Sequence, residues 1–292
     1  NIGNQWGELD DATVEDIIQT SLDGGVNLFD VAESYGIPNG LSELRLGQAL
    51  KGKRDGVYIV SKIGHWGKRT GQEIPKTTAD MIRACGHACC GRLRTEWIDV
   101  MLCHDGGIKD PSIYLEGFRQ LREEGFIRKY GISTTDLEVL KHFYDMSEGE
   151  CAVVEVDYSL INRAPEAEFL PFCREKNLGV LVRGPVAMGL LAGKYDADSV
   201  FTDPVREKWN KGQPGREAFE QRLAQAEAVK SVVGREAMVE TALRYVISHP
   251  VQPVVIPGAT KALQAAANAA AGAAELSADR LEELRRALAA AD

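Results

Sequence analysis

Four residues whose side chains can hold or move protons occupy related positions in this sequence. They lie at or just past the ends of three candidate strands: Asp30 and Tyr35 after 26–30, Lys62 at the end of 57–62, and His104 at the end of 98–104. A free phenol has a pKa near roughly 10, and a neighbouring ammonium lowers it. Lys62 can supply that ammonium, Asp30 can hold it charged and aimed, and His104 can orient a substrate oxygen.

Each of these residues alone has an ordinary structural explanation, such as a helix cap for Asp30 or a surface charge for Lys62. Because neighbouring parallel strands end at one edge of a barrel, we expect the four side chains to converge there. The combination predicts a phenol that acts as an acid toward a carbonyl or as a base toward an alcohol. A lyase with Lys62 as a Schiff-base nucleophile is an alternative, although a lysine beside Asp30 should stay protonated.

The elements that must position these groups alternate along the whole chain. The strand candidates are apolar almost throughout, which is typical of parallel strands covered on both faces. They are 26–30, 57–62, 98–104, 129–134, 152–158, 179–184 and 253–257. The helix candidates are 11–23, 41–51, 77–94, 112–123, 135–145, 166–176, 216–230, 236–248, 261–272 and 278–290. Asp10, Asp11 and Thr13 supply cap-type residues for the first helix, and Thr77 is expected to start the third.

This alternation predicts a single α/β domain over residues 1–292, a (β/α)8 TIM barrel with extra C-terminal helices. Seven candidate strands are present, so we expect the first strand of the barrel to lie upstream of Asn1. The longest irregular stretch is 194–215, which includes Arg206 and Trp209. A loop of that length is usually functional, and we expect a flap over a ligand, with an inert insertion as the alternative.

Composition excludes several classes of function. The 292 residues are 44% hydrophobic and 26% charged, with a net charge of −9. The acidic balance and the lack of a basic run argue against nucleic acid or an acidic membrane as a partner. No apolar run approaches the roughly 20 residues that a membrane-spanning helix needs. Six cysteines in a chain of this length do not predict a disulfide framework, so we expect a reduced, cytoplasmic setting.

The run CGHACC (85–90) suggests a metal site. It lies in a helical stretch, however, in which only Cys85 and Cys89 share a face. No second cluster with zinc-ligand spacing is found in the sequence. We therefore predict buried thiols and no metal.

Several segments, in order along nearly the whole chain, resemble the aldo-keto reductase family, in particular its sugar and aldehyde reductases. They are NLFDVAESYG (27–36), LSELRLGQAL (41–50), IVSKIG (59–64), RLRTEWIDVMLCHD (92–105), FRQLREEGFIRKYGIST (118–134), VEVDYSLINR (154–163), GPVAMGLLAGKY (184–195) and VVIPGATKALQAAAN (254–268). The resemblance implies an NADP(H)-dependent enzyme that reduces an aldehyde or ketone by hydride transfer. It also implies that Asp30, Tyr35, Lys62 and His104 form the catalytic tetrad, with Tyr35 as the proton donor.

The same resemblance implies a set of cofactor-binding residues. They are Ser133, Thr134, Glu155 and Arg183 near the nicotinamide, Pro185, Gly189, Leu191 and Lys194 in a pyrophosphate loop, and Gly258, Thr260, Lys261, Gln264 and Asn268 at the adenosine and its 2′-phosphate. The last group is physically sensible, because IPGATK leads into a helix whose N-terminus offers free N–H groups to a phosphate. No G-x-G-x-x-G follows a strand, so a Rossmann domain is not supported.

Three of these residues depart from the family's pattern. Glu155 stands where glutamine is usual and can accept, but not donate, a hydrogen bond at the carboxamide. Arg183 replaces the ring-stacking tyrosine; it can stack, reach across to Glu155, or hold an anionic or polyhydroxylated substrate. Gln264 stands where many members carry an arginine for the 2′-phosphate. We expect NADP(H), with NAD(H) as the alternative.

Substrate identity is weakly encoded. Trp6, His65, Trp66 and Trp209 are expected to line the pocket, and tryptophan faces often stack on sugar rings. We therefore expect a small carbonyl substrate, either a sugar carbonyl or a broader range of aldehydes. Alternatives are the reverse reaction, as an NAD(P)+-dependent sugar (aldose) dehydrogenase, and a cofactor-binding regulatory subunit like the family's channel-associated β subunits. The sequence makes no prediction of the oligomeric state.

Overall fold

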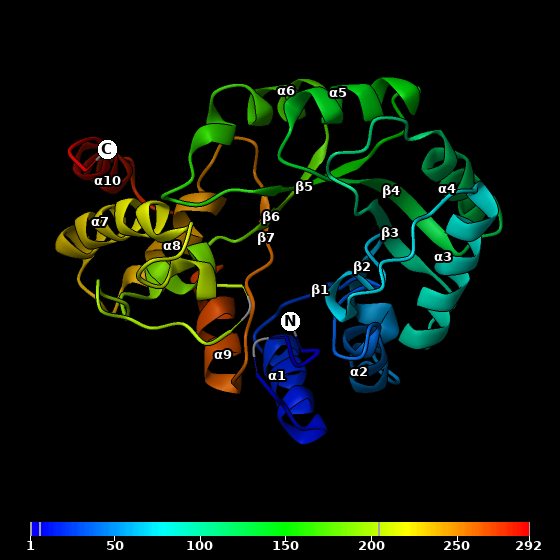
Figure 1. Ribbon diagram of the computed structural model, residues 1–292, viewed down its shortest axis with the longest axis horizontal. Helices are drawn as coiled ribbons and strands as arrows, with labels where there is room; N and C mark the ends of the chain where they lie inside the picture. Colours follow the sequence, from blue (N-terminus) through cyan, green and yellow to red (C-terminus); the bar gives the residue numbers. More distant parts are fainter. Residues whose placement is uncertain (1, 6, 204, 292) are drawn as a thin grey trace.

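Seven parallel strands form one sheet, in chain order, that curls around a central axis (Figure 1). This computed structural model describes residues 2–5, 7–203 and 205–291. The strands are β1 (Leu28–Asp30), β2 (Tyr58–Ile63), β3 (Ile98–Cys103), β4 (Ile127–Ser133), β5 (Val153–Asp157), β6 (Gly179–Arg183) and β7 (Val254–Val255). All seven predicted strands are confirmed, and the fold is that of a (β/α)8 barrel to which the described residues contribute seven strands.

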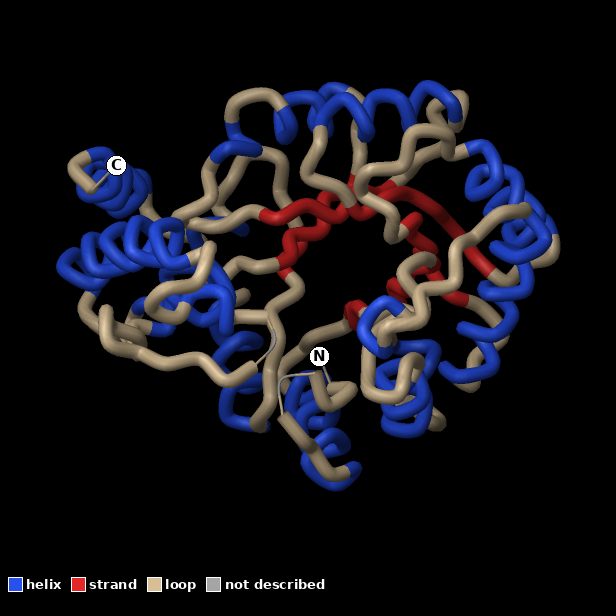
Figure 2. Tube along the Cα trace, in the orientation of Figure 1, coloured by secondary structure: helices blue, strands red, loops and turns tan. Residues whose placement is uncertain are grey.

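Helices cover the outside of the curled sheet (Figure 2). They are α1 (Asp11–Asp23), α2 (Leu41–Ala49), α3 (Ala79–Leu93), α4 (Ser112–Glu123), α5 (Leu137–Met146), α6 (Phe169–Glu175), α7 (Arg216–Val233), α8 (Met238–Ile247), α9 (Ala262–Ala271) and α10 (Ala278–Ala289). Helix α9 packs directly against α1, and a Cβ added to Gly24 would lie 2.6 Å from the Cβ of Ala269. β1 and β7 are the two edge strands of the sheet. The contact of α1 with α9 thus closes the ring of helices between these two edges.

The strands are apolar because both of their faces are covered. On the inner face, Val60, Leu102 and Leu181 form a small buried cluster. On the outer face, residues such as Ile59, Met101 and Ile132 belong to the large core shared with the helices. Burial on both sides explains the near-continuous apolar runs of the sequence.

Local capping agrees with the sequence signal at α1 and differs from it by one residue at α3. The Asp10 carboxylate accepts a hydrogen bond from the N–H of Thr13 at 2.7 Å and so caps α1. The prediction for Thr77 was wrong by one residue: the side chain of Thr78 caps α3 by accepting from the N–H of Met81. The hydroxyl of Thr77 instead contacts the sulfur of Met81.

The segment 194–215 is tied to the preceding loop by one arginine. Arg206 forms an ion pair with Asp203 at 2.8 Å and hydrogen bonds with the hydroxyl of Tyr195 and the carbonyl oxygen of Met188. A short 3-10 helix, Glu207–Trp209, follows. The contacts join this segment to the loop that follows β6. Its role as a flap over a ligand stays a prediction.

Candidate active site

A polar layer lies inside the curled sheet, at the carboxyl ends of the strands. Side chains of a strand alternate between faces, so residues two apart share a face. Asp30 follows Leu28, Lys62 follows Val60, and Glu155 follows Val153 by two positions. The three apolar residues belong to the inner cluster. On the inner face, the last apolar side chain of each of these three strands is therefore followed directly by a charged one.

Lys62 is the centre of this layer. Its side chain is 0% exposed, and its Nζ lies 2.6 Å from both oxygens of the Asp30 carboxylate. The same nitrogen lies 3.1 Å from Oε2 of Glu155, 3.1 Å from the carbonyl oxygen of Val31 and 3.4 Å from the hydroxyl of Tyr35. The structure thus brings together Asp30, Tyr35 and Lys62 as predicted from their strand ends, and adds Glu155.

His104 lies against the phenol ring of Tyr35. The rings of Tyr35 and His104 meet edge to face, with centroids 5.6 Å apart. The ring of His65 lies beside His104 at a centroid distance of 5.4 Å. The backbone N–H of His104 donates to the carbonyl oxygen of Ile63 at 2.9 Å, which fixes the end of β3 against β2. Tyr35, Lys62 and His104 therefore surround one small volume at the strand ends.

The environment of Tyr35 corrects one expectation. Burial raises the pKa of Tyr35 above its usual value, Lys62 opposes this, and the carboxylates of Glu155 and Asp30 add to the increase. The sequence predicts a lowered pKa because it places an ammonium beside the phenol, but it does not reveal the burial that outweighs this charge. The phenol therefore keeps its proton at neutral pH.

The two charged partners are also shifted. Burial raises the pKa of Asp30 to about 7, with Lys62 opposing and Glu155 adding to the increase. Burial alone would lower the pKa of Lys62, but the charges of Asp30 and Glu155 outweigh it and raise the pKa overall. Lys62 is therefore a permanent cation, and the proton that exchanges near neutrality is held by a carboxyl group.

A buried glutamate, which the sequence analysis did not identify, braces the loop between Asp30 and Tyr35. Oε1 of Glu33 accepts a hydrogen bond from the N–H of Gly64 at 2.8 Å and pairs with Nζ of Lys76 at 3.0 Å. Both side chains are buried. The pair links the loop after β1 to the end of β2 and to the segment before α3. Only the position of Glu33, between two expected catalytic residues, could have identified it from the sequence.

The residues expected near the nicotinamide have partners within the protein. The hydroxyl of Ser133 donates to Oε1 of Glu155 at 3.3 Å, and that of Thr134 donates to the carbonyl oxygen of Gly106 at 2.7 Å. Arg183 does not reach Glu155: its Nη1 pairs with Asp157 at 3.0 Å. The strand register explains this, because Asp157 is directly opposite Arg183 while Glu155 is opposite Leu181.

The two expected phosphate-binding segments differ in burial. Pro185 and Leu191 are buried, Gly189 is half-buried, and Lys194 is exposed. This loop turns sharply, with left-handed backbone at Ala187, Met188 and Gly189, and the N–H groups of Ala187 and Gly189 donate to backbone carbonyl oxygens within the loop. In the other segment Gly258, Lys261 and Gln264 are exposed and Thr260 and Asn268 half-buried. Oε1 of Gln264 accepts from the N–H of Thr260 at 2.8 Å, and the amide of Asn268 donates to the carbonyl oxygen of Gly258.

The expected pocket residues separate into two groups. His65 lies beside His104 and pairs with Glu73 at 2.7 Å, and Trp66 is half-buried with the guanidinium of Arg92 5.0 Å from its ring. Trp209 is instead buried in the core, between Phe201 and Phe219. An indole with 2% exposure offers no surface to a substrate. Trp6 lies outside the described residues.

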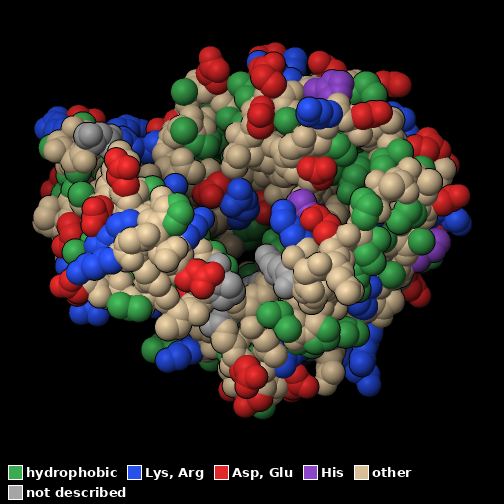
Figure 3. All heavy atoms as spheres, in the orientation of Figure 1, with side chains coloured by type: hydrophobic (Ala, Val, Ile, Leu, Met, Phe, Trp, Pro, Cys, Tyr) green, Lys and Arg blue, Asp and Glu red, His purple; other side chains and the backbone are tan. Residues whose placement is uncertain are grey.

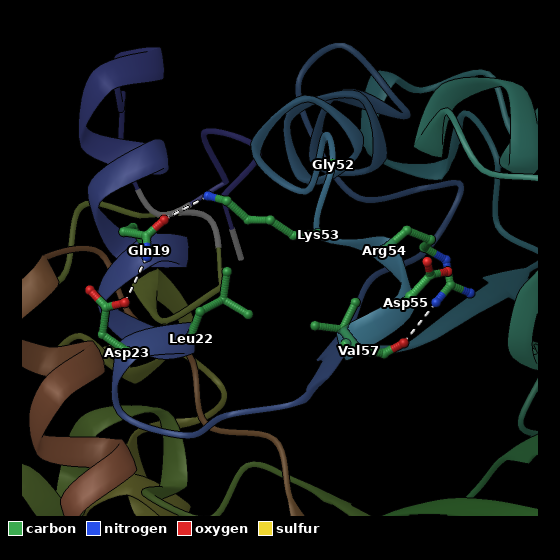
Figure 4. Close-up of a pocket in the computed structure, with 9 residues that line it drawn as sticks. Gln19, Leu22, Asp23, Gly52, Lys53, Arg54, Asp55 and Val57 are labelled. Carbon is green, nitrogen blue, oxygen red and sulfur yellow. Dashed lines mark hydrogen bonds between the residues drawn. The ribbon is translucent and has the colours of Figure 1, made fainter.

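The surface gives further indications. Figure 3 shows a hollow at the centre of one face, with acidic, basic and histidine side chains around it. A second, open hollow of about 510 Å³ lies between α1 and the start of β2, and its lining includes Gln19, Asp23, Lys53 and Val57 (Figure 4). It belongs to the amino ends of the strands and contains no tetrad residue.

The described chain shows no sign of disulfides or of a metal site. All six cysteines are free thiols, and five of them are buried. Within residues 2–5, 7–203 and 205–291, no group of three or more His, Cys, Asp or Glu side chains is arranged to hold a metal ion. In the same part of the chain, no helix is both long enough and apolar enough to span a membrane.

Comparison with known sequences supports one family. The sequence model of the Aldo/keto reductase family matches residues 1–289. An uncharacterised oxidoreductase, YqkF of Bacillus subtilis, is 29% identical over 92% of this chain and 85% of its own length. The NADH-specific methylglyoxal reductase of Escherichia coli is 30% identical over 68% of this chain and 64% of its own.

Solved structures agree. The glycerol dehydrogenase AKR11B4 of Gluconobacter oxydans superposes with a TM-score of 0.82 at 27% identity, over 99% of this chain and 88% of that one. An aldo/keto reductase of Klebsiella pneumoniae in complex with NADP and acetate gives a TM-score of 0.71 at 27% identity, over 98% and 89% of the two chains. Similarity in sequence and similarity in structure thus extend over nearly the same length.

Proposed function

The chain belongs to the aldo/keto reductase family and is an oxidoreductase; from this premise we propose that it reduces a small aldehyde or ketone with NADPH, with Tyr35 as the general acid. The observation that carries the proposal is the contact of Lys62 with both Asp30 and the hydroxyl of Tyr35, at 2.6 and 3.4 Å. A charged lysine beside a protonated phenol is the arrangement that such an acid needs.

Each residue has a defined part in the reaction. Tyr35 gives its proton to the carbonyl oxygen as negative charge develops there, and Lys62 stabilises the phenolate that remains. Asp30 holds Lys62 charged and aimed. His104, edge to face with Tyr35, orients the carbonyl oxygen. The raised pKa of Tyr35 supports the reductive direction, because that direction needs a proton on the phenol at the start.

The residues present fit a nicotinamide dinucleotide. Lys194 is exposed in the loop after β6, and Lys261 stands exposed at the start of α9, whose first N–H groups have no side-chain cap. When bound, the reduced cofactor supplies the hydride. Ser133, Thr134, Glu155 and Arg183 are proposed to bind its nicotinamide end, and Pro185, Gly189, Leu191 and Lys194 its pyrophosphate. Gly258, Thr260, Lys261, Gln264 and Asn268 are proposed for its adenosine end.

NADPH is proposed over NADH because Lys261 places a cation beside the expected 2′-phosphate and because a related structure holds NADP. Gln264 carries no charge, and one relative is NADH-specific. Quenching of tryptophan fluorescence during titration with NADPH and with NADH tests the preference. Comparable affinity for the two cofactors would contradict the preference for NADPH. The variant Gln264→Arg should raise the affinity for NADPH alone, by about tenfold, because it adds one charge-assisted hydrogen bond to the 2′-phosphate.

For the substrate, we propose a small polar carbonyl compound, such as a sugar carbonyl or a dicarbonyl. His104 beside the phenol, His65 beside His104, and the ion pair of Arg183 and Asp157 favour a polar ligand. A relative is a methylglyoxal reductase. The reverse reaction, oxidation of a polyhydroxylated alcohol with NAD(P)+, is the second candidate, because a structural neighbour is a glycerol dehydrogenase.

The decisive test replaces Tyr35 with phenylalanine. We expect Tyr35→Phe to slow NADPH oxidation, followed by the loss of absorbance at 340 nm with a panel of carbonyl compounds, by about 100- to 10,000-fold. Cofactor affinity, measured by fluorescence, should change little because only a hydroxyl is removed. Unchanged turnover in the variant would show that another group supplies the proton.

A further inference from the structure

The buried charges around Tyr35 do not balance. Lys62 contacts two carboxylates, with Nζ 2.6 Å from Asp30 and 3.1 Å from Glu155. The side chains of Lys62 and Glu155 are almost completely buried, and that of Asp30 is 11% exposed. Among residues 2–5, 7–203 and 205–291, Asp30 and Glu155 form ion pairs with Lys62 alone. One ammonium therefore faces two potential negative charges.

We propose that Glu155 is a positioning residue that acts on Tyr35 through Lys62, and that Asp30 and Glu155 together hold one exchangeable proton beside the catalytic phenol. The proposal deepens the proposed function and rests on it, since the group affected is the general acid. It assigns to Glu155 a role within the cluster in addition to any contact with a cofactor.

Electrostatics gives the reason for the proton. An unpaired ionised carboxylate inside a protein is costly, and such a group binds a proton instead. Two carboxylates that share a site cannot easily both ionise, and the second one does so at higher pH. The pKa of Asp30 near about 7 agrees with this, and Glu155 is one of its causes after burial. Because the groups are coupled, the proton belongs to the pair rather than to one carboxyl.

Hydrogen bonding gives a second reason. An ammonium has three N–H donors, yet five oxygens lie within 3.4 Å of Nζ of Lys62: two from Asp30 and one each from Val31, Glu155 and Tyr35. The longest of these contacts is the one to Tyr35. Oε1 of Glu155 accepts from the hydroxyl of Ser133, whereas its buried Oε2 has no hydrogen-bond partner among the described residues and meets Lys62 as an ion pair alone. A buried carboxylate oxygen without a donor favours the protonated form of the pair.

The charge of the pair affects the acidity of Tyr35. The titratable groups that face Lys62 are Asp30 and Tyr35 from β1 and the loop after it and Glu155 from β5, with His104 against the phenol ring. When the pair holds a proton, the two carboxyls and Lys62 together are neutral and Tyr35 is a stronger acid. When the proton leaves, the cluster carries one negative charge and Tyr35 becomes a weaker acid.

Infrared spectroscopy of the free protein tests the proton directly, with neither cofactor nor substrate present. The carbonyl stretch of a protonated carboxylic acid should disappear with a midpoint near pH 7 in the wild-type protein. Glu155→Gln keeps the shape of the side chain and removes its charge, so the midpoint should fall by roughly one to three units. Asp30→Asn should have the same effect, which keeps the test open if Glu155→Gln does not fold.

Asp157→Asn is a matched control. Asp157 lies on the same strand, two residues beyond Glu155, but pairs with Arg183 rather than with Lys62. This variant should keep the wild-type midpoint, because it leaves the cluster intact. A signal near neutrality that persists in Glu155→Gln, or that is absent from the wild-type protein, would overturn the proposal.

Kinetics supply a second readout. The wild-type kcat/KM for carbonyl reduction should fall several-fold as pH rises through neutrality, and Glu155→Gln should lose this step. Glu155→Asp, which keeps the charge, should restore it, whereas a merely structural role would lower the rate equally at every pH. If the protein shows no reductase activity, the proposed function fails, and the infrared result still decides the role of Glu155.

Discussion

The two ends of the sheet place charged residues in opposite ways. At the carboxyl ends, Lys62 and Glu155 are almost completely buried and directly in contact. At the amino ends, Lys53 reaches Gln19 at 2.6 Å, and Gln19 reaches Asp23 at 2.7 Å, around an open hollow. The open hollow has ample volume, but its polar groups are solvated. The residues proposed for catalysis therefore lie at the end where charge is buried, and the open hollow lies at the other end.

Removal of the Lys62 ammonium should have the largest effect at the carboxyl ends of the strands. Lys62→Met leaves Asp30 and Glu155 buried with no counter-ion, which should lower the free energy of unfolding by about 3–5 kcal/mol. Activity should fall at least about 100-fold. Urea unfolding and steady-state kinetics measure the two effects.

The pH dependence of that variant has a definite sign. Without Lys62, the charge that opposes the raised pKa of Asp30 is lost, so the folded-state pKa of Asp30 lies further above its unfolded value than in the wild-type protein. A raised carboxyl pKa costs stability that grows as pH rises above the unfolded value and through the folded one. Lys62→Met should therefore recover stability, relative to the wild-type protein, as pH falls from 8 toward about 5. A destabilisation that does not change with pH would mean that lost packing, rather than unpaired charge, is responsible.

A change of intermediate size is expected at the brace beside the active site. Glu33→Gln removes the charge that pairs with Lys76 and leaves one acceptor for the N–H of Gly64. We expect a loss of about 1–3 kcal/mol in the free energy of unfolding and a several-fold lower kcat, because the loop that carries Tyr35 is less firmly held. Lys76→Met should behave similarly, and the double variant should show less than the sum of the two losses.

The smallest effect is expected at the amino end. Lys53→Ala removes the contact with Gln19 in the open hollow. Stability should change by no more than about 0.5 kcal/mol, and kcat and KM should stay at their wild-type values. A marked loss of activity in this variant would show that the amino ends of the strands influence the reaction at the carboxyl ends, which would contradict the difference between them.

The sequence predicted which candidate site residues lie close together better than it predicted the pKa values of their side chains. Strand ends could be read from apolar runs, so the convergence of Asp30, Tyr35 and Lys62 followed from parallel order alone. The direction of the Tyr35 pKa shift could not, because it depends on burial and on a carboxylate from β5, 120 residues further along the chain.

Side-chain partners were the other failure. Arg183 was given Glu155 as one alternative partner, whereas register places Asp157 opposite it. Trp209 was expected on a pocket wall and is packed between two phenylalanines. Both errors concern contacts between segments whose relative placement no local pattern encodes, since amphipathic periodicity specifies a face but not the neighbour on it.

The contact of α1 with α9 has a consequence for biosynthesis. Helix α1 packs on α9, which is made later, with Gly24 against Ala269. A chain that emerges from the ribosome at about 5–20 residues per second must therefore leave the α9-facing side of α1 uncovered until α9 has been made. Nascent chains halted before residue 262 should remain sensitive to protease at α1, and should become resistant once α9 has been released.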